Sequence, residues 1–212
     1  MNLPELKVTV FSDYICPFCY VGHHRLMRLR DHYDLKINWC FIEIHPETSA
    51  EGEPVTSLNY PSEQWSRLMQ NLEEVAREED IAMAEHMFTT NSKDALLLSE
   101  AAKTQGREKF YDLHEKLFNA FFVDGRNIGD RDILRDLAHD CGIEGNIIES
   151  AWTEKKYQQR ILTNYHEARR HEIQAVPTFI FGQRKLTGVV TEDVMRSAAC
   201  DMLGSQFQQN SG

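Results

Sequence analysis

The residues Cys16-Pro17-Phe18-Cys19 constrain this chain more than any other stretch of its sequence. They follow the apolar run Val8 to Phe11 and open the segment Tyr20 to Tyr33, in which apolar residues recur at helical spacing. A cysteine at the start of a helix faces unpaired backbone N–H groups and the positive end of the helix dipole, which stabilise a thiolate. If Cys16 caps the helix and Pro17 takes its first position, the sulfur of Cys19 lies one turn later within bonding reach. The pattern predicts a dithiol that cycles between thiols and a disulfide.

Composition excludes several classes of protein. The chain has 212 residues, 42% of them hydrophobic, so it can bury one sizeable core, or one core with a smaller satellite domain. Its formal net charge of −10 and the lack of any long basic run argue against nucleic acid as a partner. The first residues do not form a signal-like segment, and no apolar stretch approaches the roughly 18 residues of a membrane span. We therefore expect a cytoplasmic globular protein without a membrane partner.

The five cysteines do not form the even framework of a secreted disulfide scaffold. Cys40, Cys141 and Cys200 are scattered singly, and we expect them to be reduced packing residues. A Cys-x-x-Cys pair can also supply half of a zinc site, but a second such pair is absent from the sequence. His23 and His24 follow the dithiol by about one helical turn, and we expect them to be solvated helix residues. We expect no metal.

Hydrophobic periodicity predicts strands near both ends of the chain and helices between them. Residues 8–11, 17–33 and 35–42 are typical of a β-α-β unit, whose two strands should be parallel and joined by a right-handed crossover. Residues 43–61 hold three of the six prolines and predict an exposed loop. Helix then follows helix for about ninety residues without a strand signal, ending with predicted helices at 147–157 and 158–172.

The strand period returns near the carboxyl end. The run Thr178 to Phe181 predicts a strand, and Lys185 to Val190 can pair with it antiparallel through a turn. Thr191 is expected to cap the final helix. Val176-Pro177 directly precedes the first of these strands, where a proline can begin a strand without breaking its ladder. We expect an α/β domain of residues 1–60 and 158–212, interrupted by an all-helical domain of residues 61–157.

This arrangement resembles the thioredoxin fold of the DsbA family, with an inserted all-helical domain. The segment Ser12 to Gly22, SDYICPFCYVG, is similar to the active-site signature of FrnE-like thiol-disulfide oxidoreductases. The segment Ala120 to Asp130, AFFVDGRNIGD, is also similar to that branch. The resemblance spans nearly the whole chain. It implies a thiol-disulfide oxidoreductase or isomerase that acts on protein or peptide disulfides and needs no cofactor beyond its dithiol.

Two cysteines and a proline are the expected catalytic residues. Cys16, at the helix tip, should attack a substrate disulfide, and Cys19 should resolve the mixed disulfide that results. The resemblance implies that Pro177 is cis and faces the dithiol, and that Val176 presents backbone groups to a bound cysteine-containing peptide. Many thioredoxin-fold oxidoreductases bury an acid six positions before the nucleophile, where this chain has Val10. The proton acceptor for Cys19 therefore stays open.

Four further residues are candidates for substrate binding. Phe18 should shape an apolar rim, and Pro17 should limit fraying of the helix beside it. Asp13 and Tyr14 precede the dithiol and are candidates to line the site, with a turn or capping role equally open for Asp13. In the second FrnE-like segment, Asp124 and Arg126 are candidates for substrate contact or for a solvated loop.

A glutathione-dependent isomerase or transferase remains the main alternative. The 2-hydroxychromene-2-carboxylate isomerases and kappa-class glutathione transferases resemble the same architecture, but they typically carry serine at the position of Cys16. The presence of both cysteines favours the oxidoreductase, with glutathione as an open co-substrate. A cytoplasmic location favours reduction or isomerisation over net disulfide formation. The sequence determines neither the redox potential, nor the physiological substrate, nor the oligomeric state.

Overall fold

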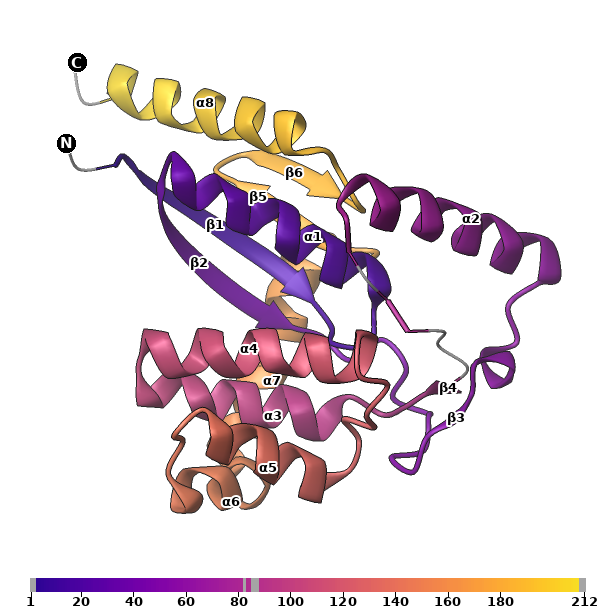
Figure 1. The fold of residues 1–212 in the computed structure, drawn as a ribbon. Helices are drawn as coiled ribbons and strands as arrows, with labels where there is room; N and C mark the ends of the chain where they lie inside the picture. Colours follow the sequence, from indigo (N-terminus) through magenta and orange to yellow (C-terminus); the bar gives the residue numbers. More distant parts are fainter. Residues whose placement is uncertain (1–2, 82, 85–87, 210–212) are drawn as a thin grey trace.

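The computed structural model describes residues 3–209, apart from residue 82 and residues 85–87. Within this range a central sheet is covered by helices, and a layer of further helices packs at one end of it (Figure 1). The strands are β1 (Glu5–Ser12), β2 (Asp34–Phe41), β3 (Glu53–Pro54), β4 (Phe88–Thr89), β5 (Thr178–Phe181) and β6 (Arg184–Thr187). The α-helices are α1 (Pro17–Arg28), α2 (Ser62–Glu78), α3 (Lys93–Ala102), α4 (Arg107–Phe122), α5 (Arg131–Asp140), α6 (Gly145–Thr153), α7 (Lys155–Arg170) and α8 (Glu192–Gln209).

The central sheet has the strand order β2-β1-β5-β6. β1 pairs with β2 in parallel, whereas β5 is antiparallel to both β1 and β6. The predicted β-α-β unit and the predicted hairpin are therefore both confirmed. The chain has the thioredoxin-like α/β fold with a helical insertion that the sequence predicted.

Side-chain alternation along β1 supplies apolar contacts to both faces of the sheet. Val8 and Val10 belong to the main core, together with residues of α1 and α8. Phe11 lies on the other face and packs with Cys40 of β2 and Ala168 of α7. Figure 1 shows α1 and α8 side by side on one face of the sheet. The dithiol at the start of α1 is thus carried by a helix that is packed along the core.

The inserted helices form their own layer, to which α7 also belongs. α7 contacts both α3 and β2, so one continuous helix joins the helical layer to the sheet. The predicted boundary between residues 157 and 158 falls inside this helix. The predicted pair of helices at 147–157 and 158–172 is wrong in its division, because the break occurs at Glu154, whose extended backbone ends α6 and precedes α7.

Two short strands depart from the predicted pattern. β3 lies within the expected loop 43–61, and it pairs antiparallel with β4, which lies within the expected helical run. Each strand has only two residues, too few to show an alternating pattern in the sequence. None of the helices in the described part of the chain is long and apolar enough to cross a membrane.

The three single cysteines differ in their exposure. Cys40 and Cys141 are buried, as expected for packing residues. Cys200 is exposed on α8, so the expectation of burial is wrong there. Its sulfur lies 3.8 Å from the hydroxyl oxygen of Tyr33.

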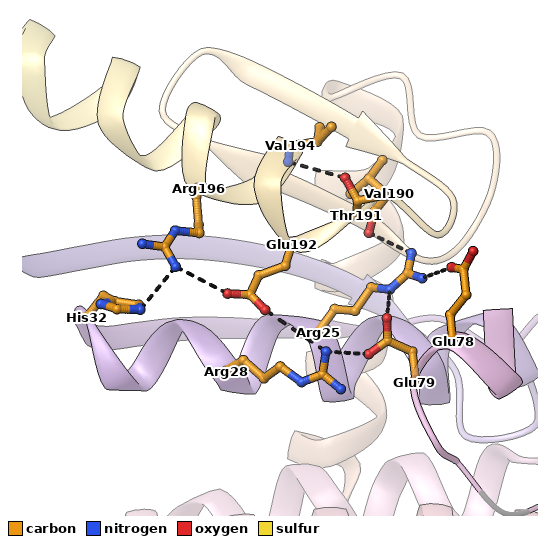
Figure 2. Close-up of polar contacts among 10 residues, drawn as sticks. All are labelled: Arg25, Arg28, His32, Glu78, Glu79, Val190, Thr191, Glu192, Val194 and Arg196. Carbon is orange, nitrogen blue, oxygen red and sulfur yellow. Dashed lines mark hydrogen bonds and ion pairs between the residues drawn. The ribbon is translucent and has the colours of Figure 1, made fainter.

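α2 is fastened to the sheet domain at its carboxyl end. The buried guanidinium of Arg25, on α1, donates to Glu79 at 2.6 Å and to Glu78 at 3.1 Å (Figure 2). It also donates to the backbone carbonyl of Val190, just before α8, at 3.1 Å. The other end of α2 extends away from α1 (Figure 1). One arginine thus joins three segments that are distant in the sequence.

Candidate active site

The backbone around the dithiol has the predicted geometry. Cys16 is the N-cap of α1, with extended dihedrals of φ −88° and ψ 112°, and Pro17 is the first helical residue. Both cysteines are free thiols and both are buried, Cys16 at 5% exposure and Cys19 at 1%. Cys16 is therefore the more accessible sulfur of the pair, as expected for the residue that meets a substrate.

The segment before β5 closes over the dithiol. The Val176–Pro177 peptide bond is cis, as the family resemblance implies. The thiol of Cys16 donates to the carbonyl oxygen of Val176 at a sulfur–oxygen distance of 3.7 Å. Pro177 is buried and Val176 is half-buried, so the backbone at Val176 is the part of this segment beside the reactive sulfur.

Gly22 allows α1 to approach this segment closely. A Cβ atom at position 22 would lie 2.9 Å from the ring of Phe179 and 3.3 Å from the ring of Pro177. Any other residue would push α1 away from β5, and with it the dithiol away from Val176. The sequence carried one sign of this contact, a glycine inside a helical pattern. Because glycine lowers helix propensity, its presence there indicates that close packing requires it.

The environment of Cys19 favours its protonated form. Burial raises the pKa of Cys19 well above its ordinary value, and a hydrogen bond to Cys16 and the negative charge of Cys16 raise it further. Hydrogen bonds from the Ser12 hydroxyl and the Asp13 backbone act in the opposite direction. Cys19 therefore keeps its proton in this environment. Val10, at the position where many relatives bury an acid, is apolar and 1% exposed.

The predicted rim residues lie at the surface of the site. Pro17 and Phe18 are both half-buried, between the buried sulfurs of the dithiol. Phe18 also packs against the main core. Part of its ring therefore contributes to the core, and the rest stays exposed next to Cys19 in the sequence.

Asp13 is fully buried, which does not suit a residue that lines an open site. Its Oδ2 accepts a hydrogen bond from the Ile44 backbone N–H at 2.8 Å and another from the Ser92 hydroxyl at 3.0 Å. Burial raises the pKa of Asp13 to about 7, although these hydrogen bonds lower it. Ser92 is the N-cap of α3, so Asp13 joins the sheet domain, the segment after β2 and the helical layer.

Tyr14 is also fully buried, and its side chain points into the helical layer instead of the substrate surface. Its hydroxyl accepts a hydrogen bond from Ser99 at 2.8 Å and donates to Nδ1 of His114 at 2.6 Å. The expectation of a solvated His23 is wrong, because its ring packs 4.8 Å from that of His114. Burial lowers the pKa of His23 to about 3 and that of His114 well below its usual range. Helical periodicity placed His23 on α1 but did not indicate that the helical layer covers that face.

The segment Ala120 to Asp130 holds the loop after β2 in place. The Asn127 side chain donates to the Ala50 carbonyl at 2.8 Å and accepts from the Gly129 backbone N–H at 2.9 Å. A Cβ atom at Gly129 would collide with Ala50 and Thr90. Asp124 is exposed and Arg126 is half-buried, next to this contact. The turn residues of this segment can be recognised in the sequence. The contact of Asn127 with Ala50 cannot, because the two residues lie 77 positions apart.

No group of three or more His, Cys, Asp or Glu side chains suited to a metal ion is found among the residues that the structure describes. Cys16 and Cys19 are the only predicted site residues whose own side chains supply redox chemistry. The segment Val176-Pro177 supplies a backbone surface beside them. The arrangement suits disulfide exchange at Cys16 with Cys19 as the second thiol.

Some known proteins are similar to this chain in sequence, and others are similar to it in fold. The protein YwbO of Bacillus subtilis (strain 168) is 32% identical over 204 residues, which cover 92% of this chain and 96% of YwbO. A probable DsbA oxidoreductase from Streptomyces coelicolor has a TM-score of 0.82 at 21% identity, covering 94% of this chain and 91% of that one. The cytosolic disulfide reductase DsbM from Pseudomonas aeruginosa, solved with GSH, has a TM-score of 0.66 at 15% identity, covering 98% of this chain and all of that one.

A family model extends this likeness from the fold to the whole sequence. It is described as the DSBA-like thioredoxin domain, and it matches residues 7–199, from β1 into α8. The matched range includes the dithiol, the helical layer and the Val176-Pro177 segment. The chain therefore belongs to the family of DsbA-like thioredoxin-domain proteins.

Proposed function

We propose that this protein exchanges thiols and disulfides with cysteine-containing protein or peptide substrates through Cys16 and Cys19. The observation that carries the proposal is the placement of the Cys16 sulfur at the start of α1, 3.7 Å from the Val176 carbonyl oxygen. A helix N-terminus stabilises a thiolate, and the thiolate is the nucleophile in exchange. Membership of a family of DsbA-like domains supports the same chemistry.

In the reducing direction, the Cys16 thiolate attacks one sulfur of a substrate disulfide. The substrate S–S bond breaks, one substrate sulfur leaves as a thiolate and takes a proton, and a mixed disulfide forms with Cys16. Cys19 then loses its proton and attacks the Cys16 sulfur, which releases the second substrate thiol. The substrate gains two electrons, and the protein is left with a Cys16–Cys19 disulfide. Oxidation of a substrate runs through the same steps in reverse.

The environment of Cys19 favours this order of events. Two causes that raise its pKa are the hydrogen bond to Cys16 and the negative charge of Cys16. Both causes are absent once Cys16 is in a mixed disulfide, because its sulfur is then neutral. The pKa of Cys19 therefore falls at the stage when Cys19 must act, without the buried acid that Val10 replaces.

We also propose a cytoplasmic location, a reducing or isomerising role, and glutathione as a candidate co-substrate. The odd number of scattered cysteines supports the location. The fold shared with a cytosolic disulfide reductase solved with GSH supports glutathione. The dithiol itself needs no further cofactor.

The test is a redox titration in glutathione buffers of graded potential, followed by acid quenching, alkylation and mass spectrometry. We expect a reversible Cys16–Cys19 disulfide, whose midpoint gives the preferred direction against a cytosolic potential of about −220 to −320 mV. A Cys16→Ser variant is the control and should form no such bond. A Cys19→Ser variant should retain substrate as a mixed disulfide on Cys16.

Thiols that stayed reduced at every potential would contradict the oxidoreductase. A stable glutathione adduct without a Cys16–Cys19 disulfide would favour the isomerase or transferase alternative instead. Exchange catalysed by the Cys16→Ser variant would exclude Cys16 as the nucleophile.

A further inference from the structure

Three aromatic rings form a surface near the dithiol that the exchange chemistry does not use. The ring of Tyr60 contacts that of His45 edge to face at a centroid distance of 6.3 Å, and it stacks on that of Trp65 at 6.0 Å. Tyr60 is 37% exposed, an unusual exposure for a large side chain that has two ring partners. We call His45, Tyr60 and Trp65 the aromatic platform.

The loop that carries the platform is tied to the protein at several points. The Ile44 backbone N–H donates to Asp13, three residues before Cys16, and the Tyr165 hydroxyl contacts the backbone of Glu43. Farther along, the Asn127 side chain holds the Ala50 carbonyl, and β3 pairs with β4. The platform is therefore built on a fixed loop that shares an anchor with the segment leading into the dithiol.

Backbone contacts place the platform near the nucleophile. The Cys16 N–H donates to the Asp13 carbonyl at 3.3 Å, and Asp13 Oδ2 accepts from the N–H of Ile44, the residue before His45. Burial raises the pKa of the Tyr60 phenol, and the negative charges of Cys16 and Glu47 raise it further. The platform therefore lies beside the segment that leads into the dithiol.

The other side of the platform continues into α2. After Trp65, the apolar residues Leu68, Met69 and Leu72 are half-buried, and the helix becomes fully buried at Val75. The Arg25 contacts shown in Figure 2 anchor α2 just beyond this point, at Glu78 and Glu79. The platform therefore lies at the exposed beginning of an apolar stripe whose other end is fastened to α1.

The carboxylates beside the platform have partners. Glu47 and Glu63 have exposed side chains, although Glu47 also contacts His45 and Glu63 pairs with Arg67. A surface of exposed rings whose neighbouring carboxylates have partners suits an apolar side chain on a peptide. It suits glutathione poorly, because glutathione has carboxylates and no apolar side chain next to its cysteine.

We propose that the aromatic platform binds an aromatic or aliphatic side chain next to the reactive cysteine of a polypeptide substrate. The inference rests on the proposed function and adds the features that would select its substrate. Tyr60 and Trp65 are specificity-determining residues in this assignment, and they take no part in the bond exchange itself.

The test compares two synthetic peptide disulfides that differ only in the residues flanking cysteine, phenylalanine in one and serine in the other. Glutathione disulfide is the third substrate. We expect Tyr60→Ala and Trp65→Ala to lower the second-order rate constant for the phenylalanine peptide by about tenfold, the worth of one good aromatic contact. The rates with the serine peptide and with glutathione disulfide should change less than about twofold.

Two variants serve as controls. Tyr60→Phe keeps the ring and should keep the preference for phenylalanine. Leu162→Ala removes an apolar side chain that is 51% exposed on α7 and has no ring contact with the platform, and it should change no rate. Thermal unfolding of each variant confirms that Trp65→Ala acts on a folded protein, and Tyr60→Ala provides the same test at a more exposed position.

Equal losses with all three substrates would overturn the inference, because they would place the effect on the dithiol and not on the flanking residue. Unchanged rates with the phenylalanine peptide would overturn it as well. The wild-type protein tests the proposed function separately. If wild type exchanges with glutathione disulfide and with neither peptide, or with no substrate at all, the proposed function itself is wrong.

Discussion

The thiol of Cys16 donates to the carbonyl oxygen of Val176, a residue 160 positions later in the chain. This contact joins the start of α1 to the segment that leads into β5. A substrate cysteine bound to Cys16 would lie beside the same backbone, so the contact defines the orientation of the exchange site. The close approach of α1 to β5 at Gly22 maintains it.

We expect Gly22→Ala to destabilise the protein by about 1–3 kcal/mol, the usual cost of overpacking a core. The added methyl group would lie 2.9 Å from Phe179 and 3.3 Å from Pro177. Gly204→Ala is a matched control, because Gly204 lies in α8 with no atom within 4 Å of the added Cβ. It should gain up to about 1 kcal/mol from helix propensity. Urea unfolding of both variants measures the difference, and a Gly22→Ala protein as stable as wild type would contradict the close packing.

Arg25 should be the most important member of the network at the end of α2. Its side chain and that of Glu79 are both buried, and removing one partner of a buried ion pair costs about 3 kcal/mol or more. Arg28 contacts the same carboxylate at 2.6 Å, but its side chain is 46% exposed. We expect Arg25→Ala to lower the free energy of unfolding by about 3 kcal/mol and Arg28→Ala by less than about 1 kcal/mol. Comparable losses in chemical denaturation would mean that burial does not distinguish the two arginines.

The buried His23 should make the protein sensitive to acid. Its pKa is lowered to about 3, so the folded state binds fewer protons than the unfolded state below pH 6.5. The stability from this group is fully present above pH 6.5 and is lost as the pH falls toward 3. In wild type, this group should change the unfolding equilibrium constant by about tenfold per pH unit between pH 6 and 4. We expect His23→Phe to lack this part of the pH dependence.

The exposed His139 provides the control for this experiment. His139→Gln removes an imidazole at the surface, so comparing it with His23→Phe separates the effect of burial from the loss of a histidine. If His23→Phe and wild type had parallel profiles between pH 6 and 4, the imidazole of His23 would not be held neutral by the fold.

Asp13 should have the opposite pH dependence. Its pKa is raised to about 7, so its contribution to stability is fully present below pH 3.8 and is lost as the pH rises through 7. Asp13→Asn keeps an oxygen that can accept from Ile44 and Ser92 but cannot ionise. We expect the Asn variant to become more stable relative to wild type as the pH rises. The difference should be about a tenfold change in the unfolding equilibrium constant per pH unit between pH 4 and 7. Asp13→Ala, which loses both hydrogen bonds, should be destabilised at every pH, and an Asn variant with a constant offset would argue for a normal carboxyl.

Local sequence patterns determined the local structure around the dithiol. The apolar run, the Cys-x-x-Cys motif and the helical spacing after it predict a capped helix that carries a dithiol, and Cys16 is that cap. The prediction succeeded because a cap, its proline and a cysteine one turn later depend on neighbours within four residues. The parallel pairing of β1 and β2 followed from a different rule, that two neighbouring strands joined by a helix lie parallel.

Tertiary structure alone decided which side chains surround the dithiol. Tyr14 and His23 could be read as accessible until the helical layer buried both against His114. Asn127 reaches Ala50 across 77 positions, and Asp13 accepts a hydrogen bond from Ile44, 31 positions later. Periodicity shows that a face is apolar, but it does not show which distant segment covers that face. Burial and pairing between remote segments depend on the packing of the whole chain, and that packing determined the surroundings of the site.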